Sequence, residues 1–421
     1  MKNMNAMLVG ILFAIWSCEC PRAQQTWKVS SSLGYGAQFS DLPQAVAAAA
    51  PGDVIWVYSV YPLMGFSNLY TAPTIDKPLT IIGFNVGLTG GSNDPTSVGL
   101  QGPLAITGIP AGERVVVTNV SMSSQWPVVS TISISDCAGS VILDDLVWNT
   151  WGVQGLGVEI DNCVDVVLRG AEFWLGSEAI EIRNSNVLMT TCWVEPWTAW
   201  GTYTTTAESI YLQNSKLTLA GSVVTARGGP APLSAVVLDN STLHVSPTTL
   251  VRGGYIAGTP GTSPGHFAPA CLLTGTGTNE VQHDLRSPPT NYGTVQPTVT
   301  WQNEVIHDWV VADELFHVQV SGPPLGFAVL ALGDYTPWAN ASTPGAPISG
   351  QLALDPFTAQ AIDVVYFPTG WANFEWTFHC PALAENGHAF ALQALTLSPA
   401  GEFGWTIPSP LTVGWDKSRT P

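Results

Sequence analysis

Basic residues are scarce in this sequence. Lys and Arg together number 13, against 31 Asp and Glu, so the formal net charge of the 421-residue chain is −18. Nucleic acids and anionic membrane surfaces bind through clusters of basic residues, and this charge makes both poor partners. Charged residues of either sign make up only 10% of the chain. Neutral glycans and divalent cations are the partners that this composition favours.

The chain also lacks a long hydrophobic run, so no transmembrane segment is predicted. The apolar stretch from Met7 to Trp16 follows Lys2 and is too short to span a bilayer. It is typical of a signal peptide cleaved after Ala23, which would make residues 1–23 a leader and the protein secreted or exposed at the cell surface. Its removal leaves 11 basic and 30 acidic residues, a net charge of −19. The alternative is a lipoprotein signal ending at Cys18.

Common catalytic signatures are missing as well. There is no His-Glu-x-x-His motif, no P-loop and no Cys-x-x-Cys pair of the kind that binds zinc. Five cysteines remain after cleavage, and an odd number leaves at least one thiol unpaired. Two of them, Cys137 and Cys163, each follow a turn residue and could form a disulfide or stack as thiols. We favour the thiols, because serine takes the equivalent place later in the chain, at Ser185, Ser215 and Ser241.

A repeat is present instead. In eight stretches, inward-facing apolar residues alternate with outward-facing residues, and each stretch ends in Asn, Asp or Gly. The final residues are Gly83, Gly102, Asn119, Asp136, Asn162, Asn184, Asn214 and Asn240. Alternate residues of a strand point to the same side, and these residue types tolerate the left-handed conformation of a sharp bend. Separations of 17 to 30 residues indicate a solenoid with stacked Asn side chains, whereas the hairpin signals of an antiparallel meander are nearly absent.

The start of the repeat carries a family resemblance. Phe39 to Val57 contains an alanine-rich segment, a Pro-Gly-Asp turn and a strand, and Thr74 to Gly83 ends in Pro-Leu-Thr-Ile-Ile-Gly. These segments resemble the entry of the pectate-lyase-like right-handed parallel β-helix family. The resemblance covers roughly residues 27–300. It implies an all-β fold, a single-stranded right-handed parallel β-helix whose N-terminal end is capped by a short helix.

The repeat stops after Asn240, and longer strands separated by Pro and Gly turns follow, which predicts a small β-sandwich over residues 305–415. The predicted strands are Leu315 to Ser321, Phe327 to Leu332, Ile348 to Leu354, Ala361 to Pro368, Phe374 to Cys380, Ala389 to Leu397 and Leu411 to Trp415. Asn386 to Ala400 resembles a C-terminal module of secreted planctomycete-type bacterial proteins. That resemblance implies export or a surface location and supplies no catalytic residue.

A first candidate site lies on outward residues of consecutive turns. Stacking would place Glu159 beside Glu181, and Asp161 beside Arg183, and like charges so close are unfavourable unless a cation offsets them. We hypothesise that Glu159, Asp161 and Glu181 bind Ca²⁺ and that Tyr211 contacts a sugar. Similarity to β-helix lyases would make Arg183 a proton acceptor and these four charged residues catalytic. The alternative is a solvated face whose salt bridge contributes less than about 1 kcal/mol.

A second candidate site is aromatic. Trp148 and Trp174 each lie 12 residues after a turn residue, and Trp197 lies 13 after one. An exposed column of this kind would offer flat apolar faces to sugar rings, and the nearby Asp145, Glu172 and Glu195 would bond their hydroxyl groups. Large aromatic residues more commonly fill a core, which is the alternative.

Three functions fit these observations. We prefer a secreted, non-catalytic β-helix that binds a polysaccharide or cell-surface glycan. The alternative is a polysaccharide lyase or glycoside hydrolase acting on an acidic polysaccharide, although the motifs of the family's galacturonan hydrolases are matched only at Asp144 and Asp145. The third is a structural envelope component. Fold resemblance alone does not choose among them.

Overall fold

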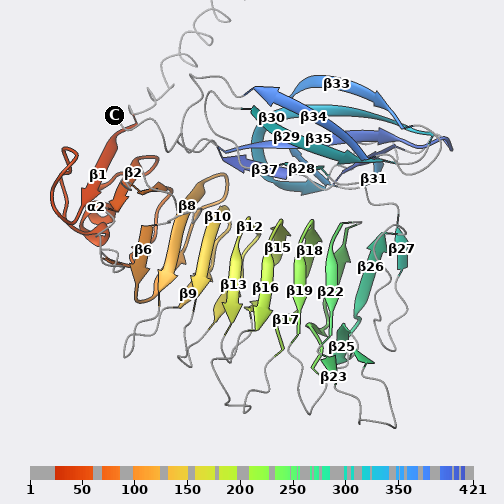
Figure 1. The fold of residues 1–421 in the computed structure, drawn as a ribbon, viewed down its shortest axis with the longest axis horizontal. Helices are drawn as coiled ribbons and strands as arrows, with labels where there is room; N and C mark the ends of the chain where they lie inside the picture. Colours follow the sequence, from red (N-terminus) through yellow and green to blue (C-terminus); the bar gives the residue numbers. More distant parts are fainter. Residues whose placement is uncertain are drawn as a thin grey trace, which may run out of the picture.

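A computed structural model describes most of the chain (Figure 1). The described residues are 24–59, 69–85, 98–123, 131–149, 157–175, 180–196, 208–226, 233–246, 248–253, 255–256, 266–267, 270–274, 277–284, 298–300, 305–307, 315–322, 325–340, 348–349, 351–354, 358–367, 373–379, 389–400, 403–406 and 409–412. The predicted leader, residues 1–23, lies outside them. No helix in these ranges is long and apolar enough to cross a membrane.

A right-handed parallel β-helix forms the first part of the molecule, as predicted, and its turns have three walls. Wall 1 consists of β4 (Thr74–Ile75), β7 (Leu104–Thr107), β9 (Ile132–Ser135), β11 (Val158–Asp161), β14 (Ile180–Arg183), β17 (Ile210–Gln213), β20 (Val236–Asp239) and β25 (Cys271–Thr274). Two strands, β8 (Arg114–Ser123) and β10 (Ser140–Asn149), bend midway and contribute to both walls 2 and 3. Walls 2 and 3 therefore form one continuous hydrogen-bonded sheet.

Wall 2 contains the first halves of β8 and β10 and the strands that stack on them. These are β1 (Thr26–Ser30), β2 (Val54–Ser59), β5 (Thr80–Asn85), β12 (Asp165–Arg169), β15 (Asn186–Thr190), β18 (Lys216–Ala220), β21 (Thr242–Val245), β26 (Glu280–Asp284) and β27 (Thr298–Thr300). Wall 3 adds β3 (Tyr70–Thr71), β6 (Val98–Gln101), β13 (Glu172–Leu175), β16 (Trp193–Pro196), β19 (Val223–Thr225) and β22 (Leu250–Arg252). A short antiparallel pair, β23 (Tyr255–Ile256) and β24 (His266–Phe267), follows β22.

The core is a stack of inward-pointing apolar side chains. On wall 1, Val158 pairs with Ile180, which pairs with Ile210, and all three are fully buried. Helix α2 (Leu42–Ala48) covers the N-terminal end, with Leu42 and Val46 packed into the core. The Asp41 carboxylate caps the helix by accepting from the backbone N–H of Leu42 at 2.9 Å. The predicted capping helix is confirmed.

The corner between walls 1 and 2 carries the predicted polar ladder. Asp136, Asn162, Asn184, Asn214 and Asn240 have φ values from 48° to 55°. The Asn240 amide donates to Asn214 Oδ1 at 2.9 Å, and the Asn162 amide donates to Asp136 Oδ1 at 2.7 Å. The ladder is broken once, because the Asn184 amide donates to Asp161 Oδ1 at 3.1 Å. Stacking of these corners is what makes residues distant in the sequence neighbours in space.

Three of the eight predicted turn residues do not belong to this ladder. Asn119 lies at the corner between walls 2 and 3, and Gly102 precedes β7. Gly83 lies inside β5, where the Asn119 amide donates to its carbonyl oxygen at 2.7 Å. A Cβ atom at Gly83 would be 2.1 Å from the Asn119 carbonyl oxygen. Gly83 therefore makes room for the neighbouring turn and does not bend the chain.

The cysteines in the described ranges are buried thiols. Cys137, Cys163, Cys192 and Cys271 are all free, which agrees with the thiol interpretation of the first two. A hydrogen bond with Cys137, followed by burial, raises the pKa of the Cys163 thiol. The Ser185 hydroxyl, in the equivalent place one turn later, accepts from the Cys163 backbone N–H at 2.9 Å. Cysteine and serine thus share one position in the stack.

Two mainly antiparallel sheets form the C-terminal part, as the sandwich prediction requires. One sheet contains β28 (Val305–His307), β29 (Leu315–Ser321) and β34 (Asn373–His379). The other contains β30 (Phe327–Asn340), β31 (Ile348–Ser349), β32 (Gln351–Leu354), β33 (Gln360–Tyr366), β35 (Ala389–Leu397), β36 (Phe403–Trp405) and β37 (Ser409–Thr412). The exception to the antiparallel pairing is the β31–β36 pair, which is parallel. Buried side chains from both sheets, including Val318, Leu330 and Leu392, make a separate core. Sequence reasoning missed β28 and β36 and ended β30 too early.

Candidate functional site

The acidic patch on wall 1 has the predicted register. Glu159 pairs with Glu181, which pairs with Tyr211, and Asp161 pairs with Arg183. Adjacent parallel strands lie about 4.8 Å apart, so these outward side chains are direct neighbours. The stacking argument made from the sequence is confirmed at these positions.

Several side chains of the patch are engaged in an ion pair and hydrogen bonds on wall 1 itself. Arg183 forms an ion pair with Glu181, and both side chains are more than a third exposed. The Tyr211 hydroxyl lies 3.4 Å from Asp239 Oδ2, which also accepts from Gln213. Burial and then Asp239 raise the pKa of Tyr211. The geometry in the described ranges matches the solvated-face alternative, with an exposed ion pair contributing little.

Wall 1 gives no support to the hypothesis of a Ca²⁺ site. Calcium takes six to eight oxygen ligands, usually including several carboxylates. Within the described residues, no three His, Cys, Asp or Glu side chains are grouped to hold a metal ion. Glu159, Asp161 and Glu181 lie along two strands, and Glu181 is engaged by Arg183.

Trp148 is not part of an exposed column. Its side chain is 1% exposed and packs edge-on against Phe173 in the core, with ring centroids 6.3 Å apart. One extra residue explains the error: Ser140 follows Asp136 by four positions, whereas its register partner Asp165 follows Asn162 by three. Trp148 therefore pairs with Phe173 and not with Trp174, which lies one position further on β13. The side chain of Trp174, and Trp197 altogether, fall outside the described part of the structure.

Among the described side chains of wall 3, the exposed aromatic one is that of Trp193. Its side chain is 42% exposed, and its indole N–H donates to Glu195 Oε2 at 3.0 Å. Its register partners are Glu172 on β13, which is exposed, and Val223 on β19, which is partly exposed. Trp193 lies directly after the inward-facing Cys192 and so points outward, and this alternation was the signal available for it in the sequence.

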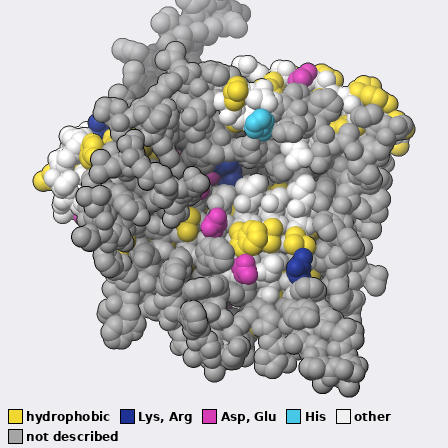
Figure 2. Space-filling model, in the orientation of Figure 1, with side chains coloured by type: hydrophobic (Ala, Val, Ile, Leu, Met, Phe, Trp, Pro, Cys, Tyr) yellow, Lys and Arg dark blue, Asp and Glu magenta, His cyan; other side chains and the backbone are white. Residues whose placement is uncertain are grey.

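We call this surface the Trp193 face and define it by the outward residues Glu172, Trp193, Glu195, Val223, Thr225, Leu250 and Arg252. Figure 2 shows hydrophobic side chains in a row on the solenoid, with acidic and basic side chains at the border of the row. Glu172 and Glu195 occupy diagonal positions on adjacent strands, which places their Cα atoms about 7–8 Å apart. A flat aromatic ring between two carboxylates can stack on a sugar ring while the carboxylates accept from its hydroxyls.

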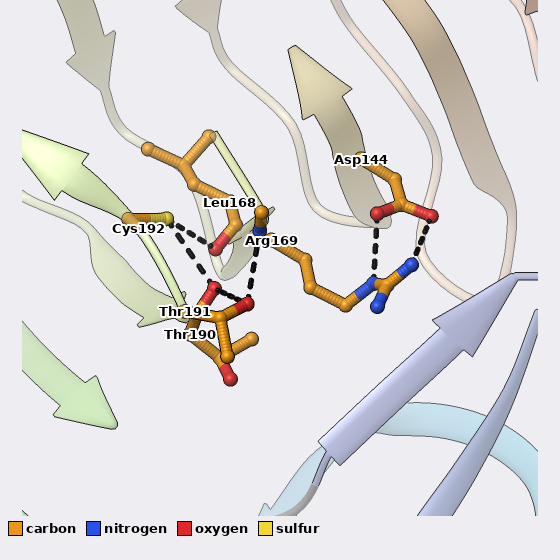
Figure 3. Close-up of polar contacts among 7 residues, drawn as sticks. Asp144, Leu168, Arg169, Thr190, Thr191 and Cys192 are labelled. Atoms are coloured by element: carbon orange, nitrogen blue, oxygen red, sulfur yellow. Dashed lines mark hydrogen bonds and ion pairs between the residues drawn. The ribbon is translucent and has the colours of Figure 1, made fainter. Parts of the chain in front are cut away.

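The Asp-Asp pair has a structural role at both of its positions. Asp144 is fully buried and forms an ion pair with Arg169, at 2.7 Å to Nε and 2.9 Å to Nη2 (Figure 3). Asp145 has a φ of 50° and makes the corner between walls 2 and 3. Burial of Asp144 leaves it no access to a polymeric substrate.

Comparisons with known proteins add little to this picture. No protein-family model and no curated protein matches the chain. Among solved structures, the chain is similar to full-length tailspike protein 2 from Escherichia coli O157:H7 bacteriophage CAB120, with 12% identity and a TM-score of 0.27. The match covers 86% of this chain and 64% of the tailspike. Its low TM-score carries no argument about function, and the resemblances to pectate-lyase-like and planctomycete-type proteins stay predictions.

Proposed function

We propose that the protein is a secreted or surface-exposed β-helix that binds a glycan on the Trp193 face. The observation that carries the proposal is Trp193 itself, a large aromatic side chain left exposed on a regular sheet and oriented by Glu195. Tryptophan offers a large apolar surface with one hydrogen-bonding end, a combination suited to a ligand that is apolar on its ring face and polar at its edge. Sugars have this character.

The chemistry of the face favours a neutral glycan. Glu172 and Glu195 border Trp193, and Arg252 on β22 is the basic residue of the face. Carboxylates accept hydrogen bonds from hydroxyl groups and repel a carboxylated sugar. An acidic polysaccharide would therefore meet repulsion beside the aromatic ring, which argues against the substrate class of the enzymatic alternative.

A binding experiment tests the proposal. Mature protein is immobilised and titrated with a panel of neutral and acidic oligosaccharides, and we expect a neutral one to bind with a Kd that Trp193→Ala raises at least tenfold. That factor is about 1.4 kcal/mol, the size expected for loss of one aromatic contact. The matched control is Tyr211→Ala on wall 1, which should leave the Kd unchanged. Equal binding by wild type and Trp193→Ala would reject the Trp193 face as the site.

A glycoside hydrolase is the second candidate, and the diagonal placement of Glu172 and Glu195 favours it. Glycoside hydrolases use a pair of carboxyl groups, one as general acid and the other as base or nucleophile. Incubation with the bound oligosaccharide distinguishes the two functions: new reducing ends that disappear in Glu172→Gln and Glu195→Gln would establish hydrolysis. Binding without new reducing ends would establish the non-catalytic function.

A further inference from the structure

The C-terminal sandwich packs against the outer face of wall 2 (Figure 1). Outward side chains of a solenoid are usually polar, but wall 2 presents an apolar stripe across successive turns at Val116, Ile142, Val167 and Leu188. All four are at most 2% exposed and form one cluster with Tyr335, Leu354 and Ala391 of the sandwich. This contact joins segments more than 100 residues apart and leaves wall 3, with the Trp193 face, uncovered.

One buried carboxylate lies at the centre of this contact. The Tyr335 hydroxyl donates to Asp165, with both carboxylate oxygens 2.9 Å away, and Asp165 is 2% exposed. Arg114 on β8 donates from Nη2 to the Tyr335 carbonyl oxygen at 2.5 Å, and its guanidinium lies 5.7 Å from the centre of the tyrosine ring. Asp165 is on the solenoid and Tyr335 on the sandwich, so the bond exists only while the two parts are docked.

We propose that the contact between Asp165 and Tyr335, which we call the latch, strengthens docking of the sandwich at low pH. Docking on wall 2 buries Asp165 and drives it to take up a proton. In the undocked protein, Asp165 would be an outward residue on an open sheet, solvated as in an ordinary peptide. Docking removes that water. The hydrogen bond from the Tyr335 hydroxyl stabilises the charged carboxylate less than bulk water does. Docking and protonation are therefore linked.

The groups around Asp165 set the direction of the linkage. Burial raises the pKa of Asp165 to about 6, against the lowering effects of Ser140 on β10, Tyr335 on β30 and Arg114 on β8. Burial lowers the pKa of Arg114, and Tyr335, Asp334 and Asp165 act to raise it. An arginine side chain remains a cation throughout this pH range. His244 is also an outward residue of wall 2, and burial and then Lys216 lower its pKa to about 3, so it would lose a proton on docking and oppose Asp165. The chain used to test the latch therefore carries His244→Gln, which removes this opposing titration.

The sign of the effect follows from these values. Once His244 is replaced, the docked state binds more protons than the undocked state between pH 4 and pH 6 because of Asp165, so docking is strongest below about pH 4 and weakens as the pH rises to about 6. Above pH 6 Asp165 is ionised in both states and the dependence ends. A difference of about two pKa units corresponds to about a hundredfold change in the docking equilibrium over this window. This inference does not depend on glycan binding.

Fluorescence energy transfer between the two parts tests the latch. The exposed residues Val164 and Val364 are replaced by cysteine and labelled with a donor and an acceptor. The chain carries Cys380→Ser, since the other mature cysteines are buried, and His244→Gln, and it serves as wild type in this test. Urea is added at several pH values, and the urea concentration at which energy transfer is lost is compared with that for loss of circular dichroism. We expect the transfer midpoint to fall as pH rises from 4 to 6 and to be constant above 6.

Two variants decide the result. Asp165→Asn cannot titrate, so its transfer midpoint should not change with pH, whereas Asp363→Asn, which removes an exposed carboxylate from β33, should behave as wild type. Tyr335→Phe removes the hydrogen bond that favours the charged carboxylate, so its pH dependence should extend above pH 6 even if docking is weakened overall. The latch is rejected if Asp165→Asn keeps the wild-type pH dependence, or if the wild-type midpoint does not change with pH.

Discussion

The buried ion pair between Asp144 and Arg169 gives the sharpest stability prediction. The two side chains are 0% and 5% exposed, and Arg169 contacts Asp144 through two nitrogens, at 2.7 and 2.9 Å. The change Asp144→Ala leaves a guanidinium on the covered face of wall 2 without its carboxylate. Removing one partner of a buried pair costs about 3–5 kcal/mol, because the remaining charge is neither solvated nor paired. We expect a loss of this size in the free energy of unfolding of the solenoid.

The ion pair between Glu181 and Arg183 is the matched control. Its side chains are 36% and 38% exposed, so water screens the charges and Glu181→Gln should cost less than about 1 kcal/mol. Urea unfolding at pH 7, followed by circular dichroism, measures both variants. The double change Asp144→Leu with Arg169→Leu should recover much of the loss, since it leaves no charge unpaired. Equal effects of Asp144→Ala and Glu181→Gln would refute the reasoning from burial.

Two further predictions concern the corners. Gly83→Ala should destabilise the solenoid by several kcal/mol in the same urea assay, because the new Cβ would meet the Asn119 carbonyl oxygen at 2.1 Å. A wild-type midpoint would show that this contact relaxes without cost. At Asn214, with a φ of 49°, alanine should lower the free energy of unfolding by about 1 kcal/mol more than glycine, because glycine adopts this conformation freely. Thermal unfolding of Asn214→Ala and Asn214→Gly compares the two variants. Equal melting temperatures would contradict the conformational argument.

Much of the fold could be predicted because it depends on local pattern. Inward residues such as Val158 and Ile160 alternate with outward ones, and Asn162 supplies the left-handed corner that turns the strand into wall 2. These signals repeat at every turn, so an error at one turn is corrected by the next. Cysteine and serine at the same point after the corner likewise indicated a common buried position, which Cys163 and Ser185 share.

The candidate site was harder to predict because it depends on which residues of a wall 3 strand point outward and which point into the core. A single extra residue before Ser140 turned Trp148 inward, and counting from Asp136 could not detect it. Wall 1 had the expected neighbours, but the sequence could not show that Arg183 would bond to Glu181 on its own strand.

Docking of the sandwich was beyond sequence reasoning, since the Asp165–Tyr335 bond joins residues 170 positions apart. One signal was present: the wall 2 strand β12, unlike β11 and β14 of wall 1, has apolar residues on both sides, at Val166 and Val167. A strand that is apolar on both faces is typical of one covered on both faces.

A crystal structure of the protein with its tightest-binding oligosaccharide would test the central functional claim most directly. We predict a sugar ring stacked on the indole of Trp193, with hydroxyl groups bonded to Glu172 or Glu195. A sugar bound instead along Glu159, Glu181 and Tyr211 on wall 1, with the Trp193 face empty, would contradict the account.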